Sequence, residues 1–249
     1  MLVVLVVASP VFPSKNNFVK ALRKEHPEIT TVVLNINDRK TSMILGEREK
    51  VLYGKGFIRD ELCGCTFRIS PKSFYQVNPV QTEILYQKAI EFAHLTGKES
   101  VIDAYCGIGT IGLIAASQAK EVIGVEIVEE AVTAAKENAE ANGLTNCSFL
   151  AGDVLKVIDE IEEKPDFIVL DPPREGIHPK ALPKIVDLYR CEKMLYISCK
   201  PTSLARDLVE FAKYGYRVEK VCCVDMFPGT CHVETVVLLS QQKPDDTIE

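Results

Sequence analysis

The sequence lacks tryptophan, long apolar runs and an excess of basic residues. No apolar stretch approaches the ~20 residues that a membrane-spanning helix needs, so we expect no membrane association. The formal net charge of −6 argues against a strongly basic nucleic-acid binder. With 249 residues, the chain is long enough for one large domain, or for one domain and a smaller companion.

The apolar N-terminus, residues 1–10, carries no basic residue and has only a short apolar run. These features favour a buried strand over the alternative, a secretory signal peptide. Because the chain opens directly on this strand, we expect further sequence to precede it.

Nine cysteines would indicate disulfides in a small secreted protein. This chain is larger, and its cysteines lie mostly inside apparent strands, which predicts a reduced, cytoplasmic protein. The pair Cys63 and Cys65 could indicate a metal site. Their one-residue spacing and the lack of a second Cys/His pair nearby favour ordinary strand cysteines, so we predict no metal.

The charge is unevenly distributed along the chain. Residues 1–79 carry 12 Lys and Arg against 7 Asp and Glu, whereas residues 80–249 carry 17 against 28. A basic front segment could contact a phosphate backbone. Chance composition is the alternative interpretation.

Two patterns of secondary structure divide the chain. Residues 1–75, which include most of the basic front segment, predict a small α+β domain: a strand at 3–7, a helix at 18–26, a strand at 30–35 and two or three short strands up to Ser70. Residues 76–242 alternate amphipathic helices with buried apolar strands, which predicts a doubly wound, mostly parallel, Rossmann-like sheet. The expected strands are 101–105, 121–127, 147–153, 166–171 and 194–199, and the expected helices include 79–95 and 129–142. Residues 243–249 predict a disordered tail.

The first strand of this sheet leads into a glycine-rich turn. Asp103 precedes Gly107 and Gly109, whose flexibility lets the backbone approach a ligand at the carboxyl edge of the sheet. Glu126 ends the second strand, where a carboxylate can accept both hydroxyls of a ribose. Asp153 ends the third, where it can accept an adenine amino group.

Two classes of cofactor remain open at this point. Gly107, Gly109 and Gly112 satisfy the spacing of a dinucleotide fingerprint, so NAD(P) is one candidate. Asp103 ahead of the glycines and the Asp171-Pro172-Pro173 turn after the fourth strand favour the other, because they look like an S-adenosylmethionine-dependent methyltransferase.

Cys199 and Glu234 are the candidate reactive groups. Cys199 ends the fifth strand, at the rim of the same crevice, and Thr202 could cap the following helix, whose N-terminus would favour a thiolate. Glu234 opens an apolar strand, where a carboxylate needs a partner or a function. Taken alone, each residue also fits a structural role.

Together these segments resemble the RNA uridine-5-methyltransferase family over about residues 65–240. The resemblance rests on six segments in order: FYQVN (74–78), DAYCGIGT (103–110), GVEIV (124–128), LDPPREG (170–176), YISCKPTSLARD (196–207) and DMFPGTCHVE (225–234). Within the family the chain is most similar to the bacterial enzymes that act on 23S ribosomal RNA. It resembles their catalytic portion, without the RNA-binding barrel domain and the iron–sulfur cysteine cluster found at the front of many relatives.

The resemblance implies a methyl transfer from S-adenosylmethionine to C5 of a uridine. Cys199 would add to C6 of the base, and Glu234 would remove the C5 proton. The implied cofactor residues are Gln76, Tyr105, Gly107, Gly109, Thr110, Glu126, Asp153 and Asp171. The implied substrate residues are Phe74, Gln76, Asp171 and His232. Phe74 and Tyr75 fit base stacking or core packing, and His232 could itself be read as a base.

Three other functions remain open. They are a tRNA uridine-5-methyltransferase, an amino-group methyltransferase, and a non-catalytic RNA-binding module of the same fold. Arg174 after the Asp-Pro-Pro turn disfavours the amino-group enzymes, where an aromatic residue is usual. We expect a monomer whose partner is RNA, either 23S rRNA or tRNA.

Overall fold

The computed structural model describes residues 1–41, 43–157, 161 and 164–242. The chain forms two compact units. Residues 1–60 and 66–75 make the first unit, and residues 61–65 together with those from Gln76 onward make the second. The tail predicted at 243–249 lies outside the described residues.

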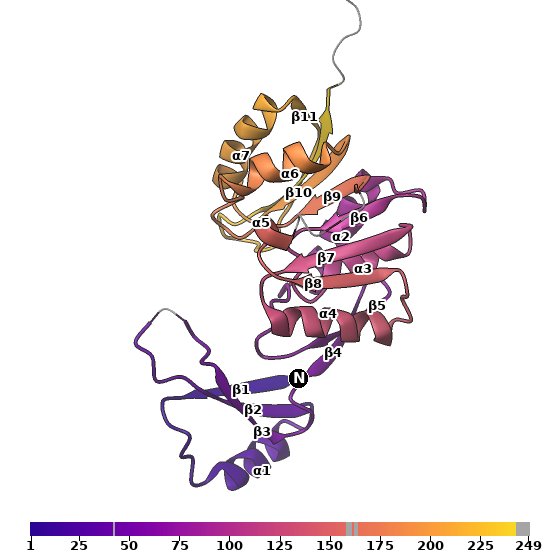
Figure 1. Ribbon diagram of the computed structural model, residues 1–249. Coiled ribbons are helices and arrows are strands. Elements are labelled where there is room, and N and C mark those ends of the chain that lie inside the picture. Colours follow the sequence, from indigo (N-terminus) through magenta and orange to yellow (C-terminus); the bar gives the residue numbers. More distant parts are fainter. Residues whose placement is uncertain (42, 158–160, 162–163, 243–249) are drawn as a thin grey trace, which may run out of the picture. The chain divides into compact units, whose positions relative to one another are not determined.

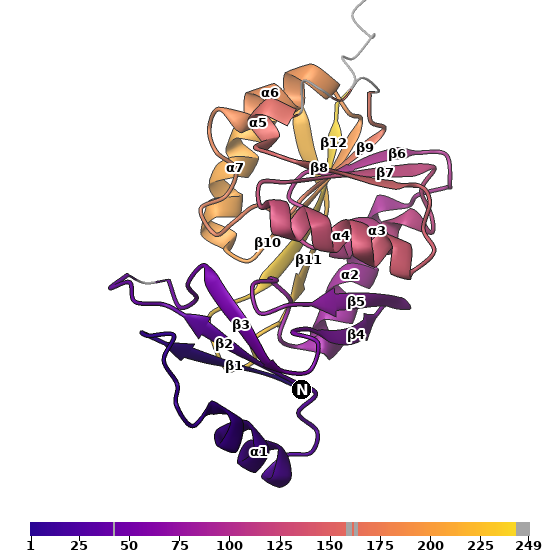
Figure 2. The same ribbon diagram turned by 60° about the horizontal axis from the view of Figure 1, so that its bottom comes forward.

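The first unit is a three-stranded sheet with one helix (Figures 1 and 2). The chain runs through β1 (Leu2–Val7), α1 (Lys15–Glu25), β2 (Thr31–Ile36) and β3 (Arg48–Tyr53). β1 pairs with β2 in parallel, and β2 pairs with β3 antiparallel. Val19 of α1 packs with Ile29 and Val32, so the helix covers an apolar face of this sheet. A separate two-stranded sheet follows, formed by β4 (Ile58–Leu62) and β5 (Cys65–Ile69).

The second unit is built on a seven-stranded sheet in the order β11-β12-β10-β9-β6-β7-β8 (Figure 2). Five of its strands pair in parallel, and β12 alone runs against its neighbours β10 and β11. This arrangement confirms the predicted doubly wound, mostly parallel sheet. The strands are β6 (Ser100–Asp103), β7 (Glu121–Glu126), β8 (Cys147–Ala151), β9 (Phe167–Leu170), β10 (Lys193–Ser198), β11 (Tyr216–Val224) and β12 (Glu234–Gln241).

The helices cover both faces of this sheet, since consecutive residues of β10 from Met194 to Ser198 are all buried. They are α2 (Pro79–Ala93), α3 (Thr110–Ala116), α4 (Glu129–Ala141), α5 (Val154–Val157), α6 (Ala181–Tyr189) and α7 (Pro201–Lys213). The Asn78 side chain caps α2 by accepting from the amide of Gln81 at 3.3 Å. Among the described residues, no helix is long and apolar enough to cross a membrane.

The structure differs from the sequence-based expectations in one unforeseen strand and in the places of the cysteines. Strand β11 was not foreseen, because its residues alternate between charged and apolar and most of them are exposed. The cysteines do not lie mostly in strands: only Cys65, Cys147, Cys222 and Cys223 do. The others occupy turns and loops, and all nine are free thiols.

Candidate active site

The acidic and thiol residues singled out in the sequence gather at one edge of the large sheet. Asp103 and Glu126 are the last residues of β6 and β7, and Asp171 and Cys199 directly follow β9 and β10. These four strands are parallel, so their carboxyl ends share one edge. Because β12 is antiparallel to β10, its first residue, Glu234, lies at that same edge.

The glycine turn after β6 is held by these carboxylates. Gly107 and Gly109 adopt φ values of +54° and +85°, a region that favours glycine. The Gly107 amide donates to Glu126 Oε2 at 3.0 Å, and the Gly112 amide donates to Asp103 Oδ2 at 3.0 Å. A β-carbon on residue 112 would lie 3.2 Å from Asp103 Oδ2, so glycine there permits the close approach.

Asp103 is fully buried, and its Oδ1 atom has no hydrogen-bond partner within the described part of the chain. Burial raises the pKa of this carboxyl to about 7, although the Gly112 amide opposes the rise. A buried acceptor without a donor is costly, so this atom suits a ligand that brings a donor. The amino group of an amino-acid moiety has that chemistry.

A pocket of about 290 Å³ opens beside this turn. Glu126 and Asp153 are its acidic lining residues, and Tyr105 and Ile127 contribute ring and aliphatic surface. Pro173, Gly176 and His178 line it from the loop that follows β9. A mostly apolar slot with two carboxylates suits a nucleoside, whose base packs on apolar groups and whose hydroxyls donate to acids. The residues present therefore fit the adenosine portion of S-adenosylmethionine.

Strand register sets Cys199 opposite Glu234. Ser198 of β10 pairs with Thr235 of β12, so the next residue of one strand faces the preceding residue of the other. The charge of Glu234 acts on the Cys199 thiol, as does that of Asp171, in keeping with their places at one edge of the sheet. Cys199 is half-buried, whereas Glu234 is buried with 4% of its surface exposed.

All three groups of this trio have pKa values raised above their ordinary ones. Burial raises the pKa of the Cys199 thiol, and Glu234 and Asp171 raise it further. Burial also raises the pKa of Glu234, and burial together with Glu234 raises the pKa of Asp171. The raised pKa gives the ionised Glu234 carboxylate a higher proton affinity than an ordinary glutamate, which suits a general base.

Arg174 is the cation at this site, and sequence reasoning used it only to disfavour an alternative. Its charge and a hydrogen bond to the Cys199 thiol both lower the pKa of Cys199. Its Nη2 atom lies 3.0 Å from His232 Nδ1. Its position directly after the Asp-Pro-Pro turn, beside an acidic crevice, was the signal that could have identified it.

Helix α7 fixes the loop that carries Arg174. Ser203 Oγ donates to the Arg174 carbonyl at 2.7 Å, and Arg206 donates to the Glu175 carbonyl at 2.5 Å. Buried Asp207 accepts from the Ile177 amide at 2.8 Å and from the Tyr196 hydroxyl at 2.7 Å. The Arg174 backbone is thus tied to the same helix that starts beside Cys199.

The expected cap at Thr202 was wrong. Pro201 takes the first helical position of α7, so the cap residue is Lys200, which makes no side-chain capping bond. The helix still begins two residues after Cys199.

The remaining predicted residues are spread more widely. Gln76 is half-buried ahead of α2, and Thr110 opens α3; neither lines the 290 Å³ pocket. Phe74 belongs to the first unit, with 76% of its surface exposed. Tyr75 packs on Phe67 with ring centroids 6.5 Å apart, which fits core packing.

Comparison with known proteins identifies the family. The family model described as tRNA (uracil-5-)-methyltransferase matches residues 34–242. The chain belongs to this uracil-5-methyltransferase family. The motif resemblance seen in the sequence is thereby confirmed.

Curated relatives of this methyltransferase family cover nearly all of the chain. An uncharacterized RNA methyltransferase of Oceanobacillus iheyensis is 44% identical over 96% of this chain and 53% of its own length. One from Listeria monocytogenes is 47% identical with the same coverage. The chain therefore spans about half the length of these relatives.

A solved structure supports the same assignment. The tRNA (uracil-54, C5)-methyltransferase of Pyrococcus abyssi, in complex with S-adenosyl-L-homocysteine, matches with a TM-score of 0.76 and 28% identity. The match covers 95% of this chain and 55% of that one. Trm5b from the same organism shares the fold alone, with a TM-score of 0.61 and 15% identity.

Proposed function

We propose that this chain transfers a methyl group from S-adenosylmethionine to C5 of a uridine in RNA. The observation that carries the proposal is the register of β10 and β12, which sets a thiol opposite a buried carboxylate. Both residues lie at the edge of the sheet that also carries a nucleoside-sized pocket. Membership of the uracil-5-methyltransferase family supports the same reaction.

Cys199 acts as the nucleophile. C5 of uracil is too weak a nucleophile to accept a methyl group unaided. The Cys199 thiolate forms an S–C6 bond, and the electron pair of the C5–C6 double bond becomes available at C5. Arg174 favours the thiolate that this step requires, because its positive charge and hydrogen bond oppose part of the effect of burial, Glu234 and Asp171.

Glu234 acts as the general base. After C5 has gained the methyl group, the C5 proton passes to a Glu234 carboxylate oxygen. The C5–H electron pair restores the C5–C6 double bond, and the S–C6 bond breaks to release the thiolate. Burial of Glu234 raises its pKa and therefore its proton affinity, which suits this transfer.

Asp103, Tyr105, Glu126 and Asp153 hold the cofactor. S-adenosylmethionine supplies an electrophilic methyl group on its sulfonium when bound. Glu126 and Asp153 accept hydrogen bonds from its nucleoside, and Tyr105 lines the same pocket. Asp103 Oδ1, buried without a donor among the described residues, accepts from its amino group.

Asp171, Gln76 and His232 of the second unit are the proposed contacts of the target base. Asp171 acts on Cys199 and Glu234 through its charge, so it is close to the point where C5 and C6 react. The Asp171 carboxyl can hydrogen-bond the edge of the uracil, as an acceptor when ionised and as a donor when protonated. The uridine must leave its stack to reach this depth.

We propose 23S ribosomal RNA as the substrate, following the bacterial enzymes that the motifs resemble. tRNA is the second candidate, because the Pyrococcus abyssi protein with 28% identity acts on a tRNA uridine. The test is to map 5-methyluridine in 23S rRNA and tRNA from cells with and without the gene. Loss of one rRNA site supports the first proposal, loss from tRNA alone supports the second, and unchanged 5-methyluridine in both would contradict the activity.

A further inference from the structure

One flank of helix α1 in the first unit carries a basic hollow. Asn16, Val19, Lys20, Arg23, Lys24 and Leu52 line it, and it encloses about 430 Å³. We call these six residues the α1 groove. Three of the six are cations, and none is an acid.

Helical spacing gathers these cations on one flank. Position 20 lies four residues after 16, three before 23 and four before 24, so these side chains project from neighbouring points on the helix. Val19 turns into the unit's core and fixes the helix on the sheet. The sheet therefore presents the basic flank in one orientation.

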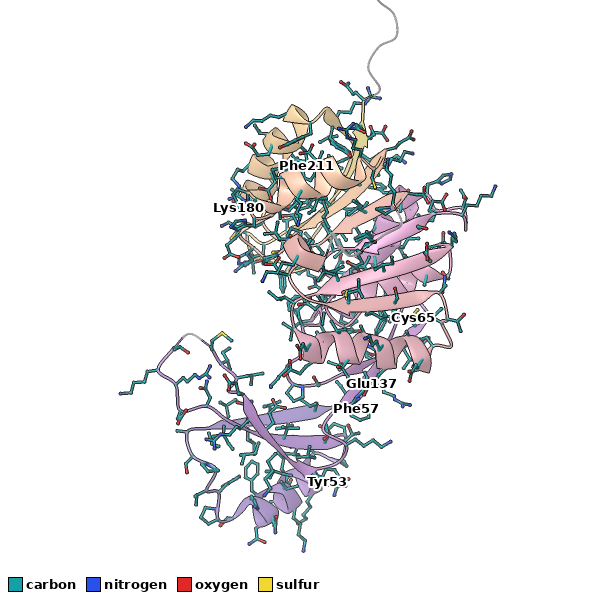
Figure 3. All side chains as sticks on the ribbon, in the orientation of Figure 1. Tyr53, Phe57, Cys65, Glu137, Lys180 and Phe211 are labelled. Carbon is teal, nitrogen blue, oxygen red and sulfur yellow. The ribbon has the colours of Figure 1, made fainter. Side chains whose placement is uncertain are left out.

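Arg23 is held in place by Tyr53 of β3. Its guanidinium carbon lies 3.7 Å from the centroid of the Tyr53 ring, and Figure 3 labels this tyrosine beside α1. Its Nε atom is buried with no hydrogen-bond partner inside the described ranges. A guanidinium already ordered by stacking loses less conformational entropy when it binds an anion.

The groove cations differ from helix-surface lysines elsewhere in the chain. Lys88 pairs with Glu91 at 2.5 Å, and Lys213 pairs with Glu210 at 2.7 Å. Across the residues that the structure describes, Lys20, Arg23 and Lys24 form no comparable ion pair. Three uncompensated cations around one hollow create a local positive potential in a chain whose net charge is −6.

We propose that the α1 groove binds the phosphate backbone of the RNA substrate. Lysines supply point charges for phosphate oxygens, and the stacked arginine supplies a planar donor. A lipid surface fits less well, because Val19 is buried in the core and cannot insert into a bilayer. The choice of RNA rests on the proposed function.

The test is the salt dependence of RNA binding by the double variant Lys20→Ala/Lys24→Ala. Both side chains are exposed, so their removal leaves the core unchanged. Affinity for a fluorescent single-stranded fragment of 23S rRNA is measured by anisotropy over a series of salt concentrations. Loss of two phosphate contacts should make the negative slope of log K against log salt shallower by about 1.4. Lys88→Ala/Lys213→Ala, which removes the same charge from paired positions, should keep the wild-type slope.

A slope equal to that of the wild type in the groove variant would overturn the proposal, as would an equal decrease in the control. If the Lys20→Ala/Lys24→Ala variant lost binding to anionic lipid vesicles but kept the wild-type salt slope for RNA, the α1 groove would instead be a membrane-binding surface, and the proposal would be overturned. RNA binding is measured without methyl transfer, so this test is independent of the proposed reaction. The reaction is tested separately, by covalent trapping of the protein on RNA that carries 5-fluorouridine. A wild type that binds RNA through the α1 groove but forms no such adduct would refute the reaction and leave the groove proposal standing.

Discussion

Replacement of Arg174 by methionine should make Cys199 less reactive. The Arg174 guanidinium hydrogen-bonds the thiol and is the group whose charge opposes the effects of Glu234, Asp171 and burial on it. A hydrogen bond to a charged group contributes about 1.5–3 kcal/mol, and the half-exposed thiol argues for the lower end. Loss of this interaction should raise the pKa of Cys199 further and lower the thiolate fraction near neutral pH by about tenfold.

The assay is alkylation of Cys199 by iodoacetamide as a function of pH. Peptide mass spectrometry is needed to follow this one thiol among nine. In the wild type the rate should still rise with pH above neutrality, because the thiol pKa is raised. Arg174→Met should shift this profile to higher pH, and Arg174→Lys should fall between the two. Arg217→Met removes an exposed arginine of β11 as the matched control. An unchanged or faster alkylation of Arg174→Met would refute the assigned role of Arg174.

Three further results are expected. Asp207→Ala should lower the free energy of unfolding by about 2–5 kcal/mol in chemical denaturation, because the Ile177 amide and Tyr196 hydroxyl lose a buried acceptor. Asp207→Asn should recover part of that loss, and an equal loss of stability in both variants would contradict the role of these hydrogen bonds. Affinity for S-adenosylhomocysteine, measured by calorimetry, should weaken below about pH 7. Burial raises the pKa of Asp103 to about 7, and its protonation removes the anion that is proposed to face the amino group of the ligand. Asp103→Asn should bind weakly at every pH, and a pH dependence retained in this variant would exclude Asp103 as its source. Gly109→Ala should destabilise the fold by about 1–3 kcal/mol, because residue 109 has φ of +85° and its β-carbon would lie 3.2 Å from Ala135 and Phe149. Gly97→Ala, with φ of +86° and open space, should cost less, and equal costs would show that crowding is unimportant.

The sheet was predictable because its central strands are buried on both faces. Segments such as residues 167–170 and 194–197 are continuously apolar between helical patterns, which is typical of parallel strands. The carboxyl ends of such strands share an edge, so the sequence alone could bring together Asp103, Glu126 and Cys199. Strand β11 was missed because it pairs with a single neighbour at the sheet's edge, where one apolar face suffices.

Side-chain partners across loops could not be predicted. The bond between Arg174 and His232 joins residues 58 positions apart, and the one between Asp207 and the Ile177 amide spans 30. Periodicity and motif spacing report on local structure, whereas these contacts depend on how two loops and a helix pack. The error at Thr202 has a local cause: Pro201 takes the first helical position of α7, which makes Lys200 the cap residue.

Covalent trapping tests the central claim most directly. The protein is incubated with S-adenosylmethionine and RNA that carries 5-fluorouridine, whose C5 fluorine Glu234 cannot remove as a proton. The expected result is a stable protein–RNA adduct that maps to Cys199 by mass spectrometry and is absent from Cys199→Ala. Glu234→Gln should accumulate the adduct on unmodified RNA as well. No adduct from the wild type, or an equal adduct from Cys199→Ala, would contradict a reaction through this thiol.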